Sequence, residues 1–259
     1  MKIWTVANQK GGVGKTTTAI NVGGELALRG RRVLLLDLDP HGSMTSYFGL
    51  DPDAVERSVY TLFNRYADGE RVPLAAMLAP TGIEGLALLP ASTALVTLDR
   101  QMGSQDGGGL ILARALQDWS SRFDHCILDC PPMLGILMIN ALAAGDRLLV
   151  PVQTEYLALQ GLKRLLHTLE LLFQGSPGRF QPLLVPTLFD RRTRESMESL
   201  EWLLQHYPGL LWPGYIPVDT LFKEASRIGR PLALLRPKSR GAEAYRGLVD
   251  YLLEAEART

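Results

Sequence analysis

The chain has 259 residues, 46% of them hydrophobic, and its 27 Lys and Arg residues balance its 27 Asp and Glu residues. This length allows one large α/β domain or two small ones, with enough apolar residues for a sizeable core. A net charge of zero excludes a field that draws the whole molecule to DNA or anionic lipid, so such binding needs a local basic patch. We find no apolar run of membrane-spanning length and no leader before the first motif, and we therefore expect a cytoplasmic protein without membrane insertion.

The chain opens with a predicted strand at 3–7, a glycine-rich loop, and a predicted helix at 16–28 that ends near Gly30. The loop reads Lys10-Gly11-Gly12-Val13-Gly14-Lys15-Thr16-Thr17, which is a phosphate-binding loop with an additional lysine at its front. In such loops backbone N–H groups and the helix N-terminus surround phosphates, the second lysine neutralises their oxygens, and the threonine hydroxyl ligates Mg²⁺. We therefore predict nucleotide binding by Gly11, Gly12, Val13, Gly14, Lys15, Thr16 and Thr17.

Strand-like and helical runs then alternate along the chain. The predicted strands are 32–38, 85–89, 124–129, 146–152, 180–187 and 214–216, and the predicted helices are 109–122, 135–144, 157–173, 195–207, 222–228 and 242–257. Because the strands are largely apolar, we predict one α/β domain over 1–259, a doubly wound and mostly parallel sheet with helices on both faces. Ligands of such sheets bind beyond the carboxyl ends of the strands. The glycine-rich segment 103–109 is predicted to be a loop.

Two of the predicted strands end in aspartates. Asp37 and Asp39 close the run 33–39 and, two residues apart, point to the same side, while Asp129 ends another strand before a proline pair. A carboxylate at a strand tip can hold nucleotide-bound Mg²⁺ through a water molecule, and Asp129 is the candidate for that role. The alternative for each is a solvated loop carboxylate that caps a following helix.

Cys126 and Cys130 are the only cysteines of the chain, and they flank the strand end at Asp129. Their spacing is compatible with a metal or redox pair, but two thiols alone rarely complete a metal site. We interpret Cys126 as a small buried hydrophobic residue.

Seven segments together resemble the ParA and MinD family of deviant Walker ATPases over essentially the whole chain. They are KGGVGKTTT (10–18), VLLLDLDPHGSMTSYFG (33–49), CILDCPP (126–132), VPVQTEYLALQGL (150–162), VPTLFDRRT (185–193), IPVDTLFKEASRIGRPL (216–232) and PKSRGAEAYRGL (237–248). Within this family, DPHGSMTSYFG (39–49) and PVDTLFKEAS (217–226) are most similar to the ParC branch, whose members place chemotaxis arrays.

The resemblance implies a Mg²⁺-dependent ATPase that is slow alone and stimulated by a partner protein. It implies that Lys10 reaches the nucleotide of a second subunit, so that ATP binding drives homodimerisation; the alternative is a solvated loop lysine. It assigns Asp39 to positioning the attacking water and Asp37 to the outer shell of the magnesium, so that Lys10, Lys15 and Asp39 are the catalytic candidates and Thr16, Asp37 and Asp129 the metal candidates. His41 follows Asp39, but relatives carry glutamine there, so we expect hydrogen bonding or packing rather than proton transfer.

The same resemblance implies that the base is adenine. Thr187, Pro217, Val218 and Asp219 match the positions at which the family holds it. No guanine-reading NKxD motif follows the loop, which agrees with ATP. The expected cofactors are ATP and Mg²⁺.

Three functions are compatible with such an ATPase. The first is positioning of a cargo, a chemotaxis array or other polar machinery, through a partner protein. The second is chromosome or plasmid partition, in which the ATP dimer binds nucleoid DNA non-specifically. Basic residues occur in suitable segments: Arg191, Arg192, Arg194, Lys223, Arg227, Arg230, Lys238 and Arg240. Val218 and Leu221, however, stand where partition relatives carry arginine, which argues against strong DNA binding.

The third function covers other classes with a similar loop: a membrane-bound division regulator, an anion-pump subunit or an iron–sulfur reductase. The regulator requires a basic amphipathic C-terminal helix, whereas 252–259 is short and leans acidic. The reductase requires four thiolates at a shared cluster, and Cys130 is the single candidate thiol near the site. We therefore expect recruitment to a cell pole or to the nucleoid.

Overall fold

The computed structural model describes residues 1–102, 107–174 and 182–258. The predicted loop at 103–109 and the start of the predicted strand at 180–187 therefore lie partly outside the described residues. No helix in the described ranges is both long enough and apolar enough to cross a membrane.

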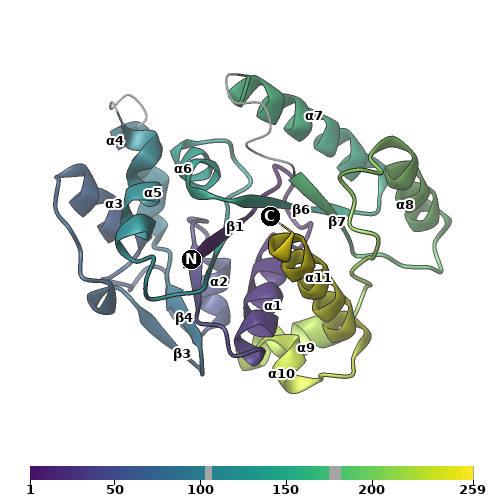
Figure 1. Ribbon diagram of the computed structural model, residues 1–259, viewed down its shortest axis with the longest axis horizontal. Helices are drawn as coiled ribbons and strands as arrows, with labels where there is room; N and C mark the ends of the chain where they lie inside the picture. The colour runs from purple at the N-terminus through teal and green to yellow at the C-terminus, as the bar shows by residue number, and fades with distance from the viewer. Residues whose placement is uncertain (103–106, 175–181, 259) are drawn as a thin grey trace.

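A seven-stranded sheet forms the centre of the molecule, with the strand order β3-β4-β2-β5-β1-β6-β7 (Figure 1). Among the strand pairs of the described chain, only β3–β4 is antiparallel. The strands are β1 (Lys2–Val6), β2 (Val33–Asp37), β3 (Ala79–Ile83), β4 (Leu86–Leu89), β5 (His125–Asp129), β6 (Arg147–Gln153) and β7 (Pro182–Thr187). The predicted class, an α/β fold with a mostly parallel sheet, is confirmed.

Helices connect the strands and cover the sheet. The α-helices are α1 (Lys15–Leu28), α2 (Ser43–Tyr47), α3 (Val59–Ala67), α4 (Leu98–Met102), α5 (Ile111–Asp118), α6 (Ile136–Ala144), α7 (Tyr156–Leu172), α8 (Arg194–His206), α9 (Leu221–Ile228), α10 (Leu232–Leu235) and α11 (Arg240–Ala257). Short 3-10 helices occupy Leu74–Ala76, Thr93–Thr97 and Gly108–Leu110.

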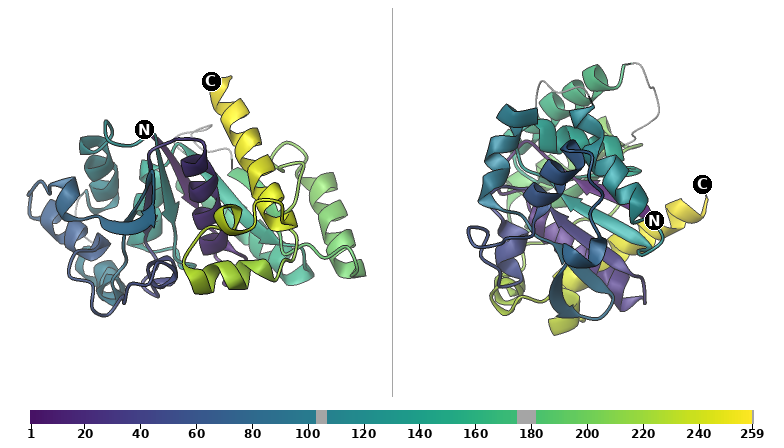
Figure 2. Two further views of the ribbon diagram at one scale, coloured as in Figure 1. Left: turned by 90° about the horizontal axis from the view of Figure 1, so that it is seen from below. Right: turned by 90° about the vertical axis from the view of Figure 1, so that its left-hand side faces the viewer.

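Each face of the sheet has its own hydrophobic core, because neighbouring residues of a strand point to opposite faces. In β2, Leu34 and Leu36 pack toward α3, α5, α6 and α7, whereas Val33 and Leu35 pack toward α1 and α11. This two-sided burial explains why the sequence of β2 is a continuous apolar run rather than an alternating one. Figure 2 shows the sheet between these two helical layers.

Several elements differ from those predicted. β3, α2, α3, α4 and α10 were not predicted; β3 contains Pro80 and Gly82, which are unusual inside a strand and are tolerated here at the edge of the sheet. The predicted strand at 214–216 is wrong: this segment forms no strand, and in the described chain the residues on either side of it make two isolated bridges, Leu184 with Leu211 and Phe189 with Pro217. The segment passes the edge of β7 without forming a ladder of its own.

The end of α11 lies beside β1 (Figure 1). The carboxylate of Glu256 in α11 accepts a hydrogen bond of 3.0 Å from the indole Nε1 of Trp4 in β1, and its other oxygen lies 3.4 Å from Nε2 of His125. The last helix is thereby attached to the middle of β1 and to the amino end of β5. The carboxyl ends of the same strands, at the opposite edge, carry the phosphate-loop residues and the aspartates.

Candidate nucleotide site at the carboxyl ends of the strands

The glycine-rich loop joins the carboxyl end of β1 to the first turn of α1. Gly12 and Gly14 have positive φ angles of 75° and 86°, a conformation that glycine adopts without steric cost. A Cβ at Gly11 would meet nothing within 4 Å, so the glycine there is not required by packing inside the chain. Gly14 leads directly into Lys15, and the N-terminal amides of α1 border the loop as anion binding requires.

Lys15 folds back over the loop. Its Nζ donates a hydrogen bond of 3.2 Å to the carbonyl of Lys10, and only 8% of the residue is exposed. A cavity of about 530 Å³ opens beside it. Its lining includes most of the predicted loop residues and Asp39, namely Gly11, Gly12, Gly14, Lys15, Thr16, Thr17 and Asp39, together with His41, Pro132, and Phe222 and Ser226 of α9.

Lys10 forms an ion pair with Glu155, the residue before α7, and both side chains are partly exposed. Asn8 fixes the backbone at Lys10. The N–H of Lys10 donates to the Asn8 side chain, and Asn8 Nδ2 donates to the carbonyl of Pro151. Lys10 is therefore not the freely solvated loop lysine of the alternative interpretation. Its partner in this structure belongs to the same chain.

Asp37 is fully buried at the end of β2 and completely hydrogen-bonded. Its Oδ2 accepts from the backbone N–H of Thr45 at 2.8 Å and from the Thr45 hydroxyl at 2.7 Å, and its Oδ1 accepts from the N–H of Asp39 at 3.2 Å. Burial raises the pKa of Asp37 to about 6, and the bonds from Thr45 and Asp39 oppose that rise. Asp37 is therefore not the solvated carboxylate of the alternative, although its bond from the Thr45 N–H in the first turn of α2 matches the helix-capping part of that alternative.

Asp129 is the register partner of Asp37 on the neighbouring strand β5, and it is equally buried. Neither of its carboxylate oxygens has a hydrogen-bond partner within the described parts of the chain. Burial raises the pKa of Asp129 well above its ordinary value, the nearby charge of Asp37 raises it further, and Thr16 and Lys15 act in the opposite direction. An unpartnered buried carboxylate beside a phosphate loop is suited to a cation that arrives with the phosphates.

Asp39 lies on the loop between β2 and α2 and borders the cavity. Its Oδ1 accepts from the N–H of His41 at 3.0 Å and lies 2.9 Å from the His41 Nδ1 atom. The imidazole itself is largely exposed. The expected hydrogen-bonding role of His41 is thus visible, and its partner is Asp39.

A second cavity, also of about 530 Å³, lies beyond the end of β7. Pro217, Val218 and Asp219 line it, as do Phe189 and Tyr215, whose rings are tilted by 41° to one another with centroids 4.1 Å apart. The first three of these residues are three of the four predicted base contacts. Leu188 precedes Phe189 and has a φ of 52°, the only positive value outside glycine among the described residues.

Thr187, the fourth predicted base contact, has another partner. It is buried, lines neither of the two cavities, and its hydroxyl donates a hydrogen bond of 2.8 Å to the carbonyl of Val13. Thr187 therefore fastens the end of β7 to the phosphate loop. A direct contact with the base stays a prediction.

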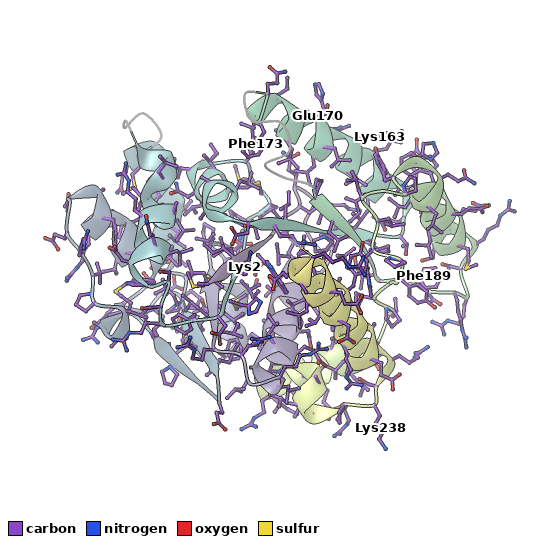
Figure 3. The ribbon with its side chains drawn as sticks, in the orientation of Figure 1. Lys2, Lys163, Glu170, Phe173, Phe189 and Lys238 are labelled. Atoms are coloured by element: carbon purple, nitrogen blue, oxygen red, sulfur yellow. The ribbon has the colours of Figure 1, made fainter. Side chains whose placement is uncertain are left out.

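Five of the eight basic residues named from the sequence fall into two groups. Arg191, Arg192 and Arg240 line the second cavity, and Lys223 and Arg227 are exposed one turn apart on α9. Arg192 is paired with Asp190 and Arg194 with Glu198. Figure 3 shows Phe189 near α8 and Lys238 near α10.

Two polar residues at the site were missed from the sequence. Glu155 binds Lys10, and Thr45 binds Asp37; each is 8 or more residues away along the chain from its partner. Both lie within segments quoted for the family resemblance, but no spacing rule connects them to their partners. Both cysteines are buried and free, and burial raises the pKa of each, as the hydrophobic interpretation predicts.

The side chains at this site could hold magnesium only if phosphate oxygens supply some of its ligands. Within the described ranges no group of three or more His, Cys, Asp or Glu side chains could hold a metal ion by itself. Asp129 offers two free oxygens, and Thr16 lies beside it in the phosphate loop. Remaining ligands would come from phosphate oxygens and water, as is usual for Mg²⁺.

Known proteins match this chain almost end to end. Residues 1–178 match the family model described as an AAA domain. The chromosome-partitioning ATPase Soj of Thermus thermophilus is 41% identical over 96% of this chain and 94% of its own length, and the sporulation initiation inhibitor protein Soj of Bacillus subtilis is 38% identical over 94% and 95%. The structure of cobyrinic acid a,c-diamide synthase from Mycobacterium smegmatis, with bound ATP analog and magnesium, superposes with a TM-score of 0.82 at 37% identity, covering 98% of this chain and 94% of that one. By these matches, the chain belongs to the ParA/MinD family of ATPases.

Proposed function

We propose that this protein is a partition ATPase, a switch that binds ATP and Mg²⁺, dimerises around the nucleotide and hydrolyses it. The observation that carries the nucleotide part is the unpartnered, buried carboxylate of Asp129 beside Lys15 and the phosphate loop. Such a group is costly in the empty protein and becomes useful when a hydrated cation enters with the phosphates. The bound ATP analog and magnesium of the Mycobacterium smegmatis structure support the same ligands here.

The two cavities would divide the nucleotide between them. Phosphates would occupy the cavity lined by Gly11, Gly12, Lys15 and Thr16, where Lys15 exchanges the Lys10 carbonyl for a phosphate oxygen. The base would lie in the cavity of Pro217, Val218 and Asp219, against the aromatic pair Phe189 and Tyr215. The Thr187 to Val13 hydrogen bond connects the two ends of this site.

Hydrolysis at this site is mostly a matter of placement and charge. Asp39 borders the phosphate cavity and would orient the attacking water, while Lys15 and the amides of the loop receive the charge that develops on the phosphate oxygens. Magnesium held by Thr16 and, through water, by Asp129 would supply further neutralisation of that charge. His41 keeps the Asp39 carboxylate in one orientation through its N–H.

Lys10 is the basis of the proposed dimer. Its Nζ is held by Glu155 in the single chain, and a second nucleotide facing the loop offers a stronger anion for it. Large apolar side chains are exposed at two places near Lys10 and the phosphate cavity. Met133 follows Pro132 of the cavity and is 72% exposed, and Tyr156 and Leu157 follow Glu155 and are 63% and 69% exposed. A second copy that covers them would bury apolar area and bring the two loops together.

Partition is favoured over array positioning by the relatives. Chromosome partitioning appears in the names of the Thermus thermophilus Soj protein and of the Myxococcus xanthus ParA protein, which is 36% identical to this chain. Array positioning is the second candidate, since the segments 39–49 and 217–226 resemble that branch and Val218 stands where partition relatives carry arginine. The two differ in whether the ATP-bound dimer holds DNA.

DNA binding by a hydrolysis-deficient variant tests the proposal. ATP-loaded Asp39→Ala protein, trapped as a dimer, is titrated with non-specific duplex DNA across a salt series, and steeply salt-dependent binding is expected. Lys223→Ala and Arg227→Ala should each weaken binding and reduce the salt slope, whereas Arg65→Ala, on the distant α3, is the charge-matched control. Dimerisation without any DNA affinity would reject partition and favour array positioning, and Lys10→Ala that still dimerised with ATP would reject the dimer mechanism.

A further inference from the structure

Thr45 is a fully buried polar residue near the phosphate cavity that does not line it. It sits in the short helix α2, and its side chain both donates and accepts a hydrogen bond. Its N–H and its hydroxyl both donate to Oδ2 of Asp37, at 2.8 Å and 2.7 Å. Its hydroxyl oxygen accepts from the N–H of Ala91 at 2.8 Å.

These bonds close the loop 38–44, which includes the first two residues of α2, at its base. The loop leaves the sheet at Asp37 and returns at Thr45, and the two end residues are held together by two bonds to one carboxylate oxygen. Asp39, at the phosphate cavity, is the second residue of this loop, and its N–H donates to the other oxygen of Asp37. The position of Asp39 relative to the sheet is therefore set by Asp37 and Thr45.

The bond to Ala91 attaches the loop to a second strand. Ala91 follows β4, which pairs in parallel with β2, so Thr45 connects the ends of two neighbouring strands. The fit of the loop is close on its outer side as well: a Cβ at Gly42 would come within 2.3 Å of the Pro52 side chain. Removing the Thr45 hydroxyl would free one oxygen contact of Asp37 and leave the Ala91 N–H without an acceptor inside the protein.

We propose that Thr45 is a positioning residue for hydrolysis, which holds the loop 38–44 so that Asp39 faces the phosphate cavity. It acts through Asp37 and Asp39 and does not touch the nucleotide. This inference rests on the proposed ATPase function and adds a residue to it. Thr45 should therefore matter for the rate of the chemical step more than for nucleotide binding, because phosphate binding belongs to the loop at 11–17.

Three threonine variants separate this role from ordinary stability. Thr45→Val keeps the shape and removes the hydroxyl, Thr45→Ser keeps the hydroxyl, and Thr5→Val is the matched control. Thr5 is equally buried, and its hydroxyl bonds the carbonyl of Ala141 in α6, away from the loop. Both valine variants lose one buried hydroxyl, but only one of them loses the bonds that hold the loop.

The measurements are kcat and KM for ATP with Mg²⁺, the affinity for a non-hydrolysable ATP analogue, and Tm. We expect Thr45→Val to lower kcat by about 10-fold or more with less than about 3-fold change in analogue affinity, Thr45→Ser to restore most of kcat, and Thr5→Val to keep kcat within about 2-fold. If Thr45→Val does not fold, Thr45→Cys, which keeps a weak donor of similar size, should fall below Thr45→Ser in kcat.

Failure of this inference and failure of the proposed function give different results. If the wild-type protein binds no ATP analogue and hydrolyses no ATP with Mg²⁺, the function itself is wrong. If the wild-type protein turns over and Thr45→Val or Thr45→Cys matches its kcat, or loses analogue affinity in proportion to kcat, the positioning role is overturned while the ATPase stands.

Discussion

The carboxyl ends of β2 and β5 each carry an aspartate at the same level of the sheet, but the two carboxylates differ in their hydrogen bonding. Asp37 and Asp129 are register partners and both are fully buried. Asp37 accepts three hydrogen bonds, whereas Asp129 accepts none within the described chain. One carboxylate is part of the protein's own structure, and the other is left open for a ligand.

The residues downstream of each aspartate explain the difference. After Asp37 the chain makes a loop and returns with Thr45, which supplies a backbone N–H and a hydroxyl. After Asp129 come Cys130, Pro131 and Pro132, and a proline has no N–H to donate. The two aspartates are equally buried at neighbouring strand ends, but the residues that follow each of them give them different hydrogen-bonding states.

The largest expected effect comes from changing the open carboxylate. Asp129→Asn should lower ATP hydrolysis by about 100-fold, because an amide replaces the anion that would hold the hydrated magnesium. Its Tm without nucleotide should not fall, since no hydrogen bond is lost. The measurement is kcat over a Mg²⁺ series alongside calorimetry. Wild-type turnover in this variant would remove Asp129 from the site.

Asp37→Asn, unlike Asp129→Asn, should lower the stability of the protein without nucleotide. An asparagine cannot accept at both former carboxylate oxygens, so we expect a loss of about 1–3 kcal/mol in the free energy of unfolding, the cost of leaving buried donors unsatisfied. Denaturant unfolding of both asparagine variants without nucleotide checks it. Equal stability of the two would contradict the contrast between β2 and β5.

A third carboxylate, that of Glu155 just after β6, has a partner that can exchange it for another anion: the ammonium group of Lys10. Glu155→Gln removes the ion pair that holds Lys10 within its own chain. Because partly exposed pairs contribute about 0.2–1 kcal/mol, the ATP concentration needed for half-maximal dimerisation should fall about 2- to 5-fold. Analytical ultracentrifugation across an ATP series measures it. A higher ATP requirement would instead place Glu155 in the dimer contact itself.

The smallest effect belongs to an aspartate at the opposite end of the sheet. Asp124, just before β5, is hydrogen-bonded by the guanidinium and N–H of Arg32, which lower its pKa to about 2. A depressed pKa contributes stability at pH above about 4, and that contribution disappears as pH falls toward 2. Since the pair is largely solvent-exposed, Asp124→Asn should cost about 0.5 kcal/mol at pH 7 and nothing near pH 2. Denaturant unfolding at the two pH values measures it, and a loss that did not depend on pH would assign it to packing.

Local patterns predicted the parallel sheet and the phosphate loop because each is encoded within a few adjacent residues. The residues 33–36 of β2 are apolar on both faces, and Gly12 and Gly14 occur where positive φ is needed. The strand predicted at 214–216 was wrong, and β3 was missed, because both lie at sheet edges where pairing depends on a neighbour rather than on the segment itself. Thr187 was assigned to the base from its position, yet its hydroxyl bonds Val13.

The chemistry available to this protein could be read from its residues alone: a phosphate loop with two lysines, three aspartates at strand ends and a whole-chain likeness to one family of ATPases. The folded arrangement sets which of these groups are free. Lys10 is held by Glu155, Asp37 is held by Thr45, and Asp129 alone of the two buried aspartates is left without a partner in the described chain. Hydrogen bonds and ion pairs form between groups that are close in space. Glu155 precedes α7 and Thr45 lies in α2, so neither partner could be identified from the residues around Lys10 or Asp37.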